Sequence, residues 1–271
     1  MLTRIVSGII GVVALVAVLV FLPVAATEIA VALVATLALF EFYRAVLGKN
    51  EFVKKLPVVI VGYIVGFAFM FTPGEFILPV VTLGTILILA CQVLFYGKIA
   101  FKDCMTALVG SIYIFALFRH VSMVRALENG RFLVFAVFVG AFITDTGAYF
   151  AGCFFGKHKL APKLSPKKTV EGSVGGVIAT VAAFFVYAYI GSRFYGYGIN
   201  VLNTAITGMV LSVVSQFGDL AASAIKREIG IKDYGNIMPG HGGALDRFDS
   251  VLFVAPVFWY LNIVLPIFVI L

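Results

Sequence analysis

The chain has 271 residues, of which 62% are hydrophobic and only 12% are charged. Because an average soluble domain carries about 25% charged residues, this composition excludes an ordinary water-soluble fold. The formal net charge is +7. A positive charge can reflect nucleic-acid binding or membrane topology, and the positions of the basic residues distinguish the two.

Nine apolar runs follow one another along the chain. Most approach the roughly 18 to 20 residues that a helix needs to cross about 30 Å of hydrocarbon. They are continuously apolar rather than alternating, and lipid requires each segment to satisfy its own backbone hydrogen bonds, which favours helices over a β-barrel. We therefore predict an all-α polytopic membrane protein with about nine transmembrane helices. The runs cover residues 5–23, 25–41, 57–72, 76–96, 104–118, 132–150, 172–190, 202–222 and 251–271.

The fifth run, 104–118, is the shortest, and the following stretch from Arg119 to Arg131 is able to extend it as an amphipathic helix. Merging or splitting the chain at this point would change the number of helices. We find no linker or convincing internal repeat, so we expect one continuous membrane domain.

The basic residues indicate how the chain is oriented. With the N-terminus in the cytosol, all but four of the 20 Lys and Arg residues fall in cytosolic segments. This distribution follows the positive-inside rule, and it explains the net charge without a nucleic-acid partner. We predict an inner (cytoplasmic) membrane protein whose polar loops and active site face the cytosol. The four exceptions are Arg119, Arg125, Arg131 and Arg193.

The sixth run contains an acidic residue, Asp145, about one turn from its predicted cytosolic end. An ionisable group at membrane depth is costly unless it is paired, which makes it a functional candidate. Two interpretations stay open. Asp145 is either a functional carboxylate or a buried residue that bonds Thr144 or Thr146 or pairs with a loop lysine.

The densest polar stretch runs from residue 215 to residue 250. Asp246 and Asp249 are three residues apart, so on a helix both carboxylates face the same way, and Asp219 joins them if the last two helices are neighbours. Three carboxylates suit a hard cation such as Mg²⁺, which takes oxygen ligands and completes its shell with water and substrate phosphates. Lys226 follows Asp219 by two helical turns and Arg247 lies between the two aspartates, where simple ion pairing is the alternative.

Two loop segments could bind an anion. The stretch His241-Gly242-Gly243 precedes a helix start, where backbone N–H groups and the helix dipole favour negative charge. The loop 151–171 ends in a segment with two adjacent lysines and two hydroxyls, Ser165, Lys167, Lys168 and Thr169. This second segment either binds substrate phosphates or anchors the chain at anionic lipid.

Together these segments resemble the signature of the phosphatidate cytidylyltransferases, the CDP-diacylglycerol synthases. The resemblance rests on Ser223-Ala-Ile-Lys-Arg227, Lys232-Asp233, the glycine-rich stretch up to Gly243, and Leu245-Asp-Arg-Phe-Asp249. The segments around Asp145 and 165–172 extend it, so it covers residues 140 to 255. Val170 stands where relatives commonly have tryptophan and Ala244 where a larger aliphatic residue is usual, which concerns local packing rather than charged groups.

The resemblance implies transfer of CMP from CTP to phosphatidic acid, forming CDP-diacylglycerol and pyrophosphate with Mg²⁺ as cofactor. It places the catalytic helices and cytosolic loops in 131–271 and leaves 1–130 without an assigned role, a homodimer interface being one hypothesis. The expected metal ligands are Asp219, Asp246 and Asp249. The expected catalytic residues are Lys226, His241, Asp246 and Arg247. The expected substrate-binding residues are Asp145, Ser165, Lys167, Lys168, Thr169, Ser223, Arg227, Gly242 and Gly243.

Three other functions compete with this prediction. An ion-coupled transporter also uses intramembrane acids and broken helices, but its sites lie near the midplane of the membrane. Another CTP-dependent enzyme, either an ether-lipid CDP synthase or a lipid kinase, would share the interfacial site. A structural scaffold would leave the aspartates unexplained.

Overall fold

The computed structural model describes residues 2–48, 51–237 and 242–269, and for residues 2–7 and 9 it describes the backbone alone. Eight helical stretches of this described part are long and apolar enough to cross a membrane, and Ile10–Phe21 is a shorter apolar helix. The protein is therefore an all-α polytopic membrane protein, as the sequence predicted. The helices are α1 (Leu2–Phe21), α2 (Val24–Val46), α3 (Leu56–Phe71), α4 (Ile77–Leu94), α5 (Phe101–Ser111), α6 (Leu117–Arg125), α7 (Gly130–Phe155), α8 (Val170–Tyr195), α9 (Val201–Glu228) and α10 (Leu245–Val264).

The predicted spans end a few residues short of α7, α8 and α9, and two other spans differ more substantially. The fifth continues as α5, a π-helical turn (Ile112–Ala116) and α6, so the stretch beginning at Arg119 does extend it. The last was expected at 251–271, whereas α10 begins at Leu245 and ends at Val264. An apolar window excludes Asp246 and Asp249, although both lie in the first turns of α10, so the sequence placed its start too late. Two short 3-10 helices, Phe52–Lys55 and Gly74–Phe76, precede α3 and α4.

The chain divides into two compact units. Unit 1 comprises Met1–Ser122 with Ile229–Phe248, and unit 2 comprises Met123–Glu228 with Asp249–Leu271. Unit 1 therefore contains the first helices together with the glycine-rich loop before α10. Unit 2 contains α7, α8, α9 and most of α10.

A buried polar contact fixes the centre of unit 1. The hydroxyl of Tyr43 in α2 donates to the carbonyl of Ala107 at 2.6 Å and lies 2.9 Å from the Ser111 hydroxyl in α5. The Ser111 hydroxyl also lies 2.6 Å from the carbonyl oxygen of Gly62 in α3. A side chain on Gly62 would overlap the Tyr43 ring, so the glycine allows α2, α3 and α5 to meet around these bonds.

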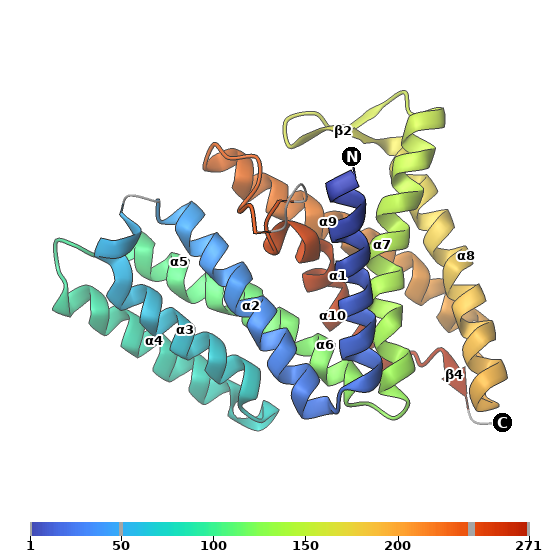
Figure 1. Ribbon diagram of the computed structural model, residues 1–271, viewed down its shortest axis with the longest axis horizontal. Helices are drawn as coiled ribbons and strands as arrows, with labels where there is room; N and C mark the ends of the chain where they lie inside the picture. The colour runs from blue at the N-terminus through green and yellow to red at the C-terminus, as the bar shows by residue number, and fades with distance from the viewer. Residues whose placement is uncertain (1, 49–50, 238–241, 270–271) are drawn as a thin grey trace. The chain divides into compact units, whose positions relative to one another are not determined.

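Small residues bring α7 and α8 together in unit 2, where the two helices lie side by side (Figure 1). A Cβ on Gly147 would lie 2.6 Å from that of Ala179, and a Cβ on Gly175 would overlap Ala151. Close backbone approach through glycine and alanine is a common way to pack helices in lipid, where burial of apolar surface does not drive association.

Two short antiparallel hairpins complete unit 2. Strands β1 (Lys159–Ala161) and β2 (Ser165–Thr169) connect α7 to α8. Strands β3 (Gly198–Ile199) and β4 (Phe268–Val269) pair the loop before α9 with the segment after α10.

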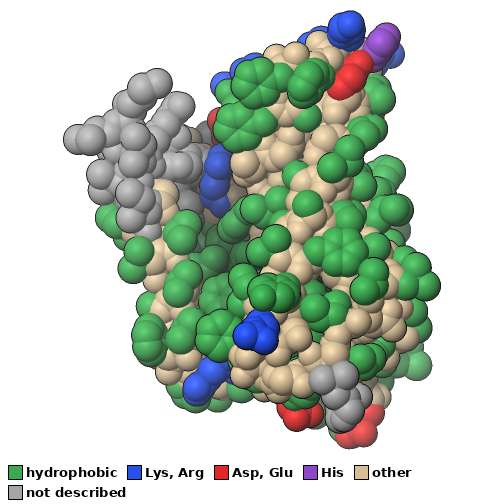
Figure 2. Space-filling model, turned by 90° about the vertical axis from the view of Figure 1, so that its right-hand side faces the viewer, with side chains coloured by type: hydrophobic (Ala, Val, Ile, Leu, Met, Phe, Trp, Pro, Cys, Tyr) green, Lys and Arg blue, Asp and Glu red, His purple; other side chains and the backbone are tan. Residues whose placement is uncertain are grey.

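Large hydrophobic side chains are exposed along the helices, among them Leu33, Ile64, Leu78 and Ile178. On the face shown in Figure 2, hydrophobic side chains cover most of the surface and charged side chains are few. Such a surface is suited to lipid rather than to water.

Candidate active site

A cavity of about 550 Å³ lies in unit 2 where α7 ends, α8 begins and α9 passes. Six of the residues predicted from the sequence line it: Asp145, Ser165, Lys167, Lys168, Thr169 and Asp219. Residues from three separate segments of the chain thus line one polar cavity. A binding site built from the predicted motifs requires this arrangement. Among the remaining lining residues are Tyr149, Cys153, Lys159, Ser173 and Gln216.

An ion pair and a hydrogen-bonded pair join residues that line this cavity. The ammonium group of Lys168 in β2 contacts the carboxylate of Asp219 in α9, and both side chains are about a quarter exposed. Beside them, the Ser173 hydroxyl donates to Gln216 Oε1 at 2.5 Å, and Gln216 Nε2 donates back to the Ser173 carbonyl at 3.3 Å. These contacts fix the hairpin and the start of α8 against α9.

The β1–β2 hairpin is held at its base by the first turn of α8. The Thr169 hydroxyl accepts a hydrogen bond from the Gly172 N–H at 3.1 Å and so caps the helix. The Glu171 carboxylate accepts from the backbone N–H groups of Lys157 and His158 and lies 2.6 Å from the His158 ring nitrogen. The two lysines of β2 are thereby held next to the positive end of the α8 dipole, which favours an anionic ligand.

The tip of the hairpin is connected to α9. Arg227 donates through Nε to the carbonyl of Leu164 at 3.3 Å, and its side chain is otherwise exposed. Arg227 was predicted to bind substrate, and it is not among the residues that line this cavity.

Helices α9 and α10 pack closely in unit 2. A Cβ on Gly218 would lie 2.9 Å from the backbone oxygen of Asp249. Asp249 is 7% exposed and Lys226 8% exposed, and Asp249 lies within electrostatic range of Asp219, Lys226 and Asp145. Three predicted acids and one predicted lysine therefore belong to one electrostatic neighbourhood. Ser223 is also buried on α9.

The donor set in this neighbourhood suits Mg²⁺. Among the described residues, no three His, Cys, Asp or Glu side chains are arranged as a complete metal site. Mg²⁺ does not require such a cage, because it commonly binds through one or two carboxylates and takes water and substrate phosphates as its other ligands. Asp219 and Asp249 provide two carboxylates of the required oxygen chemistry.

The remaining predicted residues lie in unit 1. Asp246 accepts hydrogen bonds through Oδ2 from the N–H groups of Tyr234 at 2.8 Å and Gly243 at 3.1 Å. Gly242 has a φ of +86°, a conformation that glycine adopts readily. Asp246 thus closes the loop in front of α10. Arg247 is exposed in the first turn of that helix, and His241 lies outside the residues that the structure describes.

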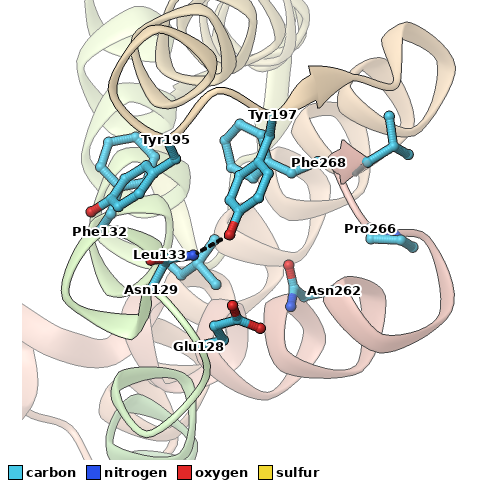
Figure 3. Close-up of a pocket in the computed structure, with 10 residues that line it drawn as sticks. Glu128, Asn129, Phe132, Leu133, Tyr195, Tyr197, Asn262, Pro266 and Phe268 are labelled. Carbon is cyan, nitrogen blue, oxygen red and sulfur yellow. Dashed lines mark hydrogen bonds between the residues drawn. The ribbon is translucent and has the colours of Figure 1, made fainter. Parts of the chain in front are cut away.

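A second cavity, of about 170 Å³, lies at the opposite ends of α7 and α8. Figure 3 shows the Tyr197 hydroxyl directed towards Asn129, whose Nδ2 donates to it at 2.8 Å, with Glu128 and Asn262 nearby. None of the residues predicted from the motifs lines this cavity, so it offers no alternative location for them.

Sequence reasoning missed several polar residues that line the 550 Å³ cavity, among them Gln216, Ser173 and Lys159. Gln216 precedes Asp219 by three residues, so helical spacing could have placed it on the same face. Ser173 lies one turn into α8, directly after the 165–172 segment. Gln216 and Ser173 were detectable as polar residues beside a predicted motif.

The fold and the cavity define a polytopic membrane protein with a polar site that combines lysines, carboxylates and a helix N-terminus. The chain belongs to the Cytidylyltransferase family, whose model matches residues 2–265.

Three relatives illustrate this similarity. The phosphatidate cytidylyltransferase of Bacillus subtilis (strain 168) is 34% identical over 239 residues, covering 83% of this chain and 84% of the relative. The proteins of the same name from Staphylococcus haemolyticus (strain JCSC1435) and Staphylococcus saprophyticus are 38% and 41% identical over 179 residues. These two alignments span 66% of this chain and 65% of each staphylococcal protein.

Proposed function

We propose that the chain transfers the CMP group of CTP to phosphatidic acid, forming CDP-diacylglycerol and pyrophosphate for phospholipid biosynthesis. Membership of the Cytidylyltransferase family and the names of its relatives support this reaction. The observation that carries it at the level of residues is the cavity in which Lys168 and Asp219 meet beside the α8 N-terminus.

The cavity has the charge that a nucleoside triphosphate requires. Lys159, Lys167 and Lys168 line it, and Lys226 lies buried on α9. The attacking group would be a phosphatidate oxygen, which is largely anionic at neutral pH because its second pKa is near 6. No strong general base is then needed. The lysines would neutralise the phosphates while the oxygen attacks the α-phosphorus in line and pyrophosphate leaves.

An adjoining apolar groove supports a lipid as the second substrate. It has a volume of about 260 Å³ and is lined by Val213, Phe217 and Leu220 of α9 and by Leu160 of β1. Ser173 and Gln216 line both spaces. A phosphate group could occupy the polar cavity while the first carbons of an acyl chain lie against the groove.

We further propose Mg²⁺ as the cofactor, with Asp219 and Asp249 as the ligands that unit 2 provides and Asp246 as the third ligand expected from the sequence. When bound, the ion would neutralise phosphate charge. The lysines and the α8 N-terminus would complete the anion site. The positive-inside distribution supports a cytosolic location of this site, where CTP is available.

The proposal is tested with the purified full chain in detergent, supplied with labelled CTP, phosphatidic acid and Mg²⁺. CDP-diacylglycerol and pyrophosphate should form together, and neither should form when phosphatidate is omitted or EDTA is added. Transfer of the γ-phosphate of CTP to a lipid would instead identify a kinase. Preference for ether-linked phosphatidate would identify the ether-lipid synthase. Substrate uptake into proteoliposomes without CTP turnover would identify a transporter.

Crosslinking in the same detergent tests the predicted homodimer.

A further inference from the structure

Unit 1 contains a buried carboxylate, Glu41, in the apolar helix α2. Glu41 is only 3% exposed. Burying a charge is costly unless hydrogen bonds compensate for the lost solvation. The carboxylate is therefore expected to have a specific partner.

That partner is the first turn of α10. Glu41 Oε2 accepts a hydrogen bond from the backbone N–H of Leu245 at 3.0 Å, and the N–H of Ala244 is a second backbone donor to the same carboxylate. The first N–H groups of a helix have no partner within the helix, and the dipole makes this end positive. Glu41 thus caps α10 although it is 204 residues distant in the sequence.

The loop before α10 is shaped to fit the same carboxylate. A Cβ on Gly235 or on Gly243 would overlap the carboxylate oxygens of Glu41. The neighbouring ring of Phe42 packs on Tyr234 with centroids 6.3 Å apart. Adjacent residues of α2 therefore contact both ends of the loop, at 234–235 and at 243–245.

The loop in turn positions Asp246. The N–H groups of Tyr234 and Gly243 both donate to Asp246 Oδ2. Tyr234 also packs on Phe42, and Gly243 lies against the Glu41 carboxylate. Moving Tyr234 or Gly243 would therefore displace Asp246.

We infer that Glu41 is a positioning residue for cytidylyl transfer, which holds residues 234–235, residues 243–245 and the start of α10 in the geometry that Asp246 needs. This inference rests on the proposed function. It gives the N-terminal helix α2 an indirect role in the reaction, through Asp246. Misplacement of a reacting group by about 1 Å can cost roughly 100-fold in rate, so the effect is expected in kcat.

The test compares Glu41→Ala and Glu41→Gln with Glu28→Ala, a matched control on the same helix. Initial rates of CDP-diacylglycerol formation are measured at several CTP concentrations, together with the midpoint of thermal unfolding. Glu41→Ala should lower kcat by about 10- to 100-fold at a temperature where the variant is fully folded. Glu41→Gln keeps an oxygen acceptor and should recover most of the rate. Glu28→Ala should behave like the wild type.

A second pair of variants tests the contact itself. Gly235→Ala should lower the kcat of the otherwise intact chain about as much as Glu41→Ala does, because its methyl group would overlap the Glu41 carboxylate and displace it. In the Glu41→Ala background the methyl group has room, so the same change should cost no more than about twofold. This pattern would link the rate to the Glu41–loop contact.

Several outcomes would overturn the inference. They are a kcat of Glu41→Ala within twofold of the wild type, a rate loss that disappears below the unfolding range, or a Gly235→Ala loss that is equal in both backgrounds. If Glu41→Ala cannot be purified, Glu41→Ser takes its place, both alone and as the background for Gly235→Ala. A wild-type chain that makes no CDP-diacylglycerol would refute the proposed function instead, and is recognised before any variant is compared.

Discussion

Replacing Asp219 by Asn separates a catalytic role of this residue from a structural one. The change removes the carboxylate that pairs with Lys168 and keeps the size of the side chain. If the carboxylate holds a metal ion against the nucleotide phosphates, loss of this single electrostatic contact should lower the rate at least 100-fold. A 100-fold loss corresponds to about 2.7 kcal/mol of transition-state stabilisation.

A structural ion pair would give a different result. Both side chains are about a quarter exposed, and pairs that reach solvent contribute up to about 1 kcal/mol to stability. Loss of such a pair would lower the unfolding midpoint by a few degrees and leave the rate of the folded protein nearly unchanged. The magnitude of the rate change therefore distinguishes the two roles.

The assay measures pyrophosphate release from CTP in detergent as Mg²⁺ is varied, for Asp219→Asn, Lys168→Met and both together. Glu228→Gln and Lys163→Met are the matched controls, since they lie on the same helix and the same hairpin but do not line the cavity. Near-normal rates for Asp219→Asn at saturating Mg²⁺ would refute the assignment. An apparent need for more Mg²⁺ in Asp219→Asn, and not in Lys168→Met, would support it.

Three further predictions concern the fold around the site. Gly175→Ala should lower the free energy of unfolding by about 1 to 3 kcal/mol, because its methyl group would overlap the facing alanine of α7. Gly74→Ala is the control, since its methyl group meets open space, and it should be neutral in the same thermal unfolding assay. Thr169→Val removes the cap of α8 and should destabilise the chain by about 1 kcal/mol, and a serine at this position should restore the stability. In a cysteine-free background, Lys163→Cys should react with an impermeant maleimide from the cytosolic side and Glu128→Cys from the other side, and the reverse pattern would refute the predicted orientation.

The helical type of the membrane spans and their approximate number were predictable because their apolar runs are long and nearly free of charge. Where the prediction of a boundary was wrong, the reason is local. Asp246 and Asp249 occupy the first turns of α10, so a hydrophobicity window cannot include them. The polar residues that identify the candidate site therefore also make the start of α10 undetectable by hydrophobicity.

The candidate site was predictable in part, since motifs 145–149, 165–172 and 215–250 carry unusual polar residues. Six of the predicted residues line one cavity, and Asp249 and Lys226 are buried in the same unit. Their chemical roles stay predictions. The capping by Glu41 was not predictable, because a single glutamate in an apolar helix gives no indication of a partner 204 residues away.

The hairpin lysines and the start of α8 also have a kinetic consequence. Because Lys159, Lys167 and Lys168 gather at one helix end, they form a field that should attract a polyanion before any specific contact is made. Such steering acts over roughly 8 Å at physiological ionic strength and weakens as salt is added. Capture of a dilute triphosphate would then be fast in low salt and slower in high salt, while turnover of a saturated enzyme would change little.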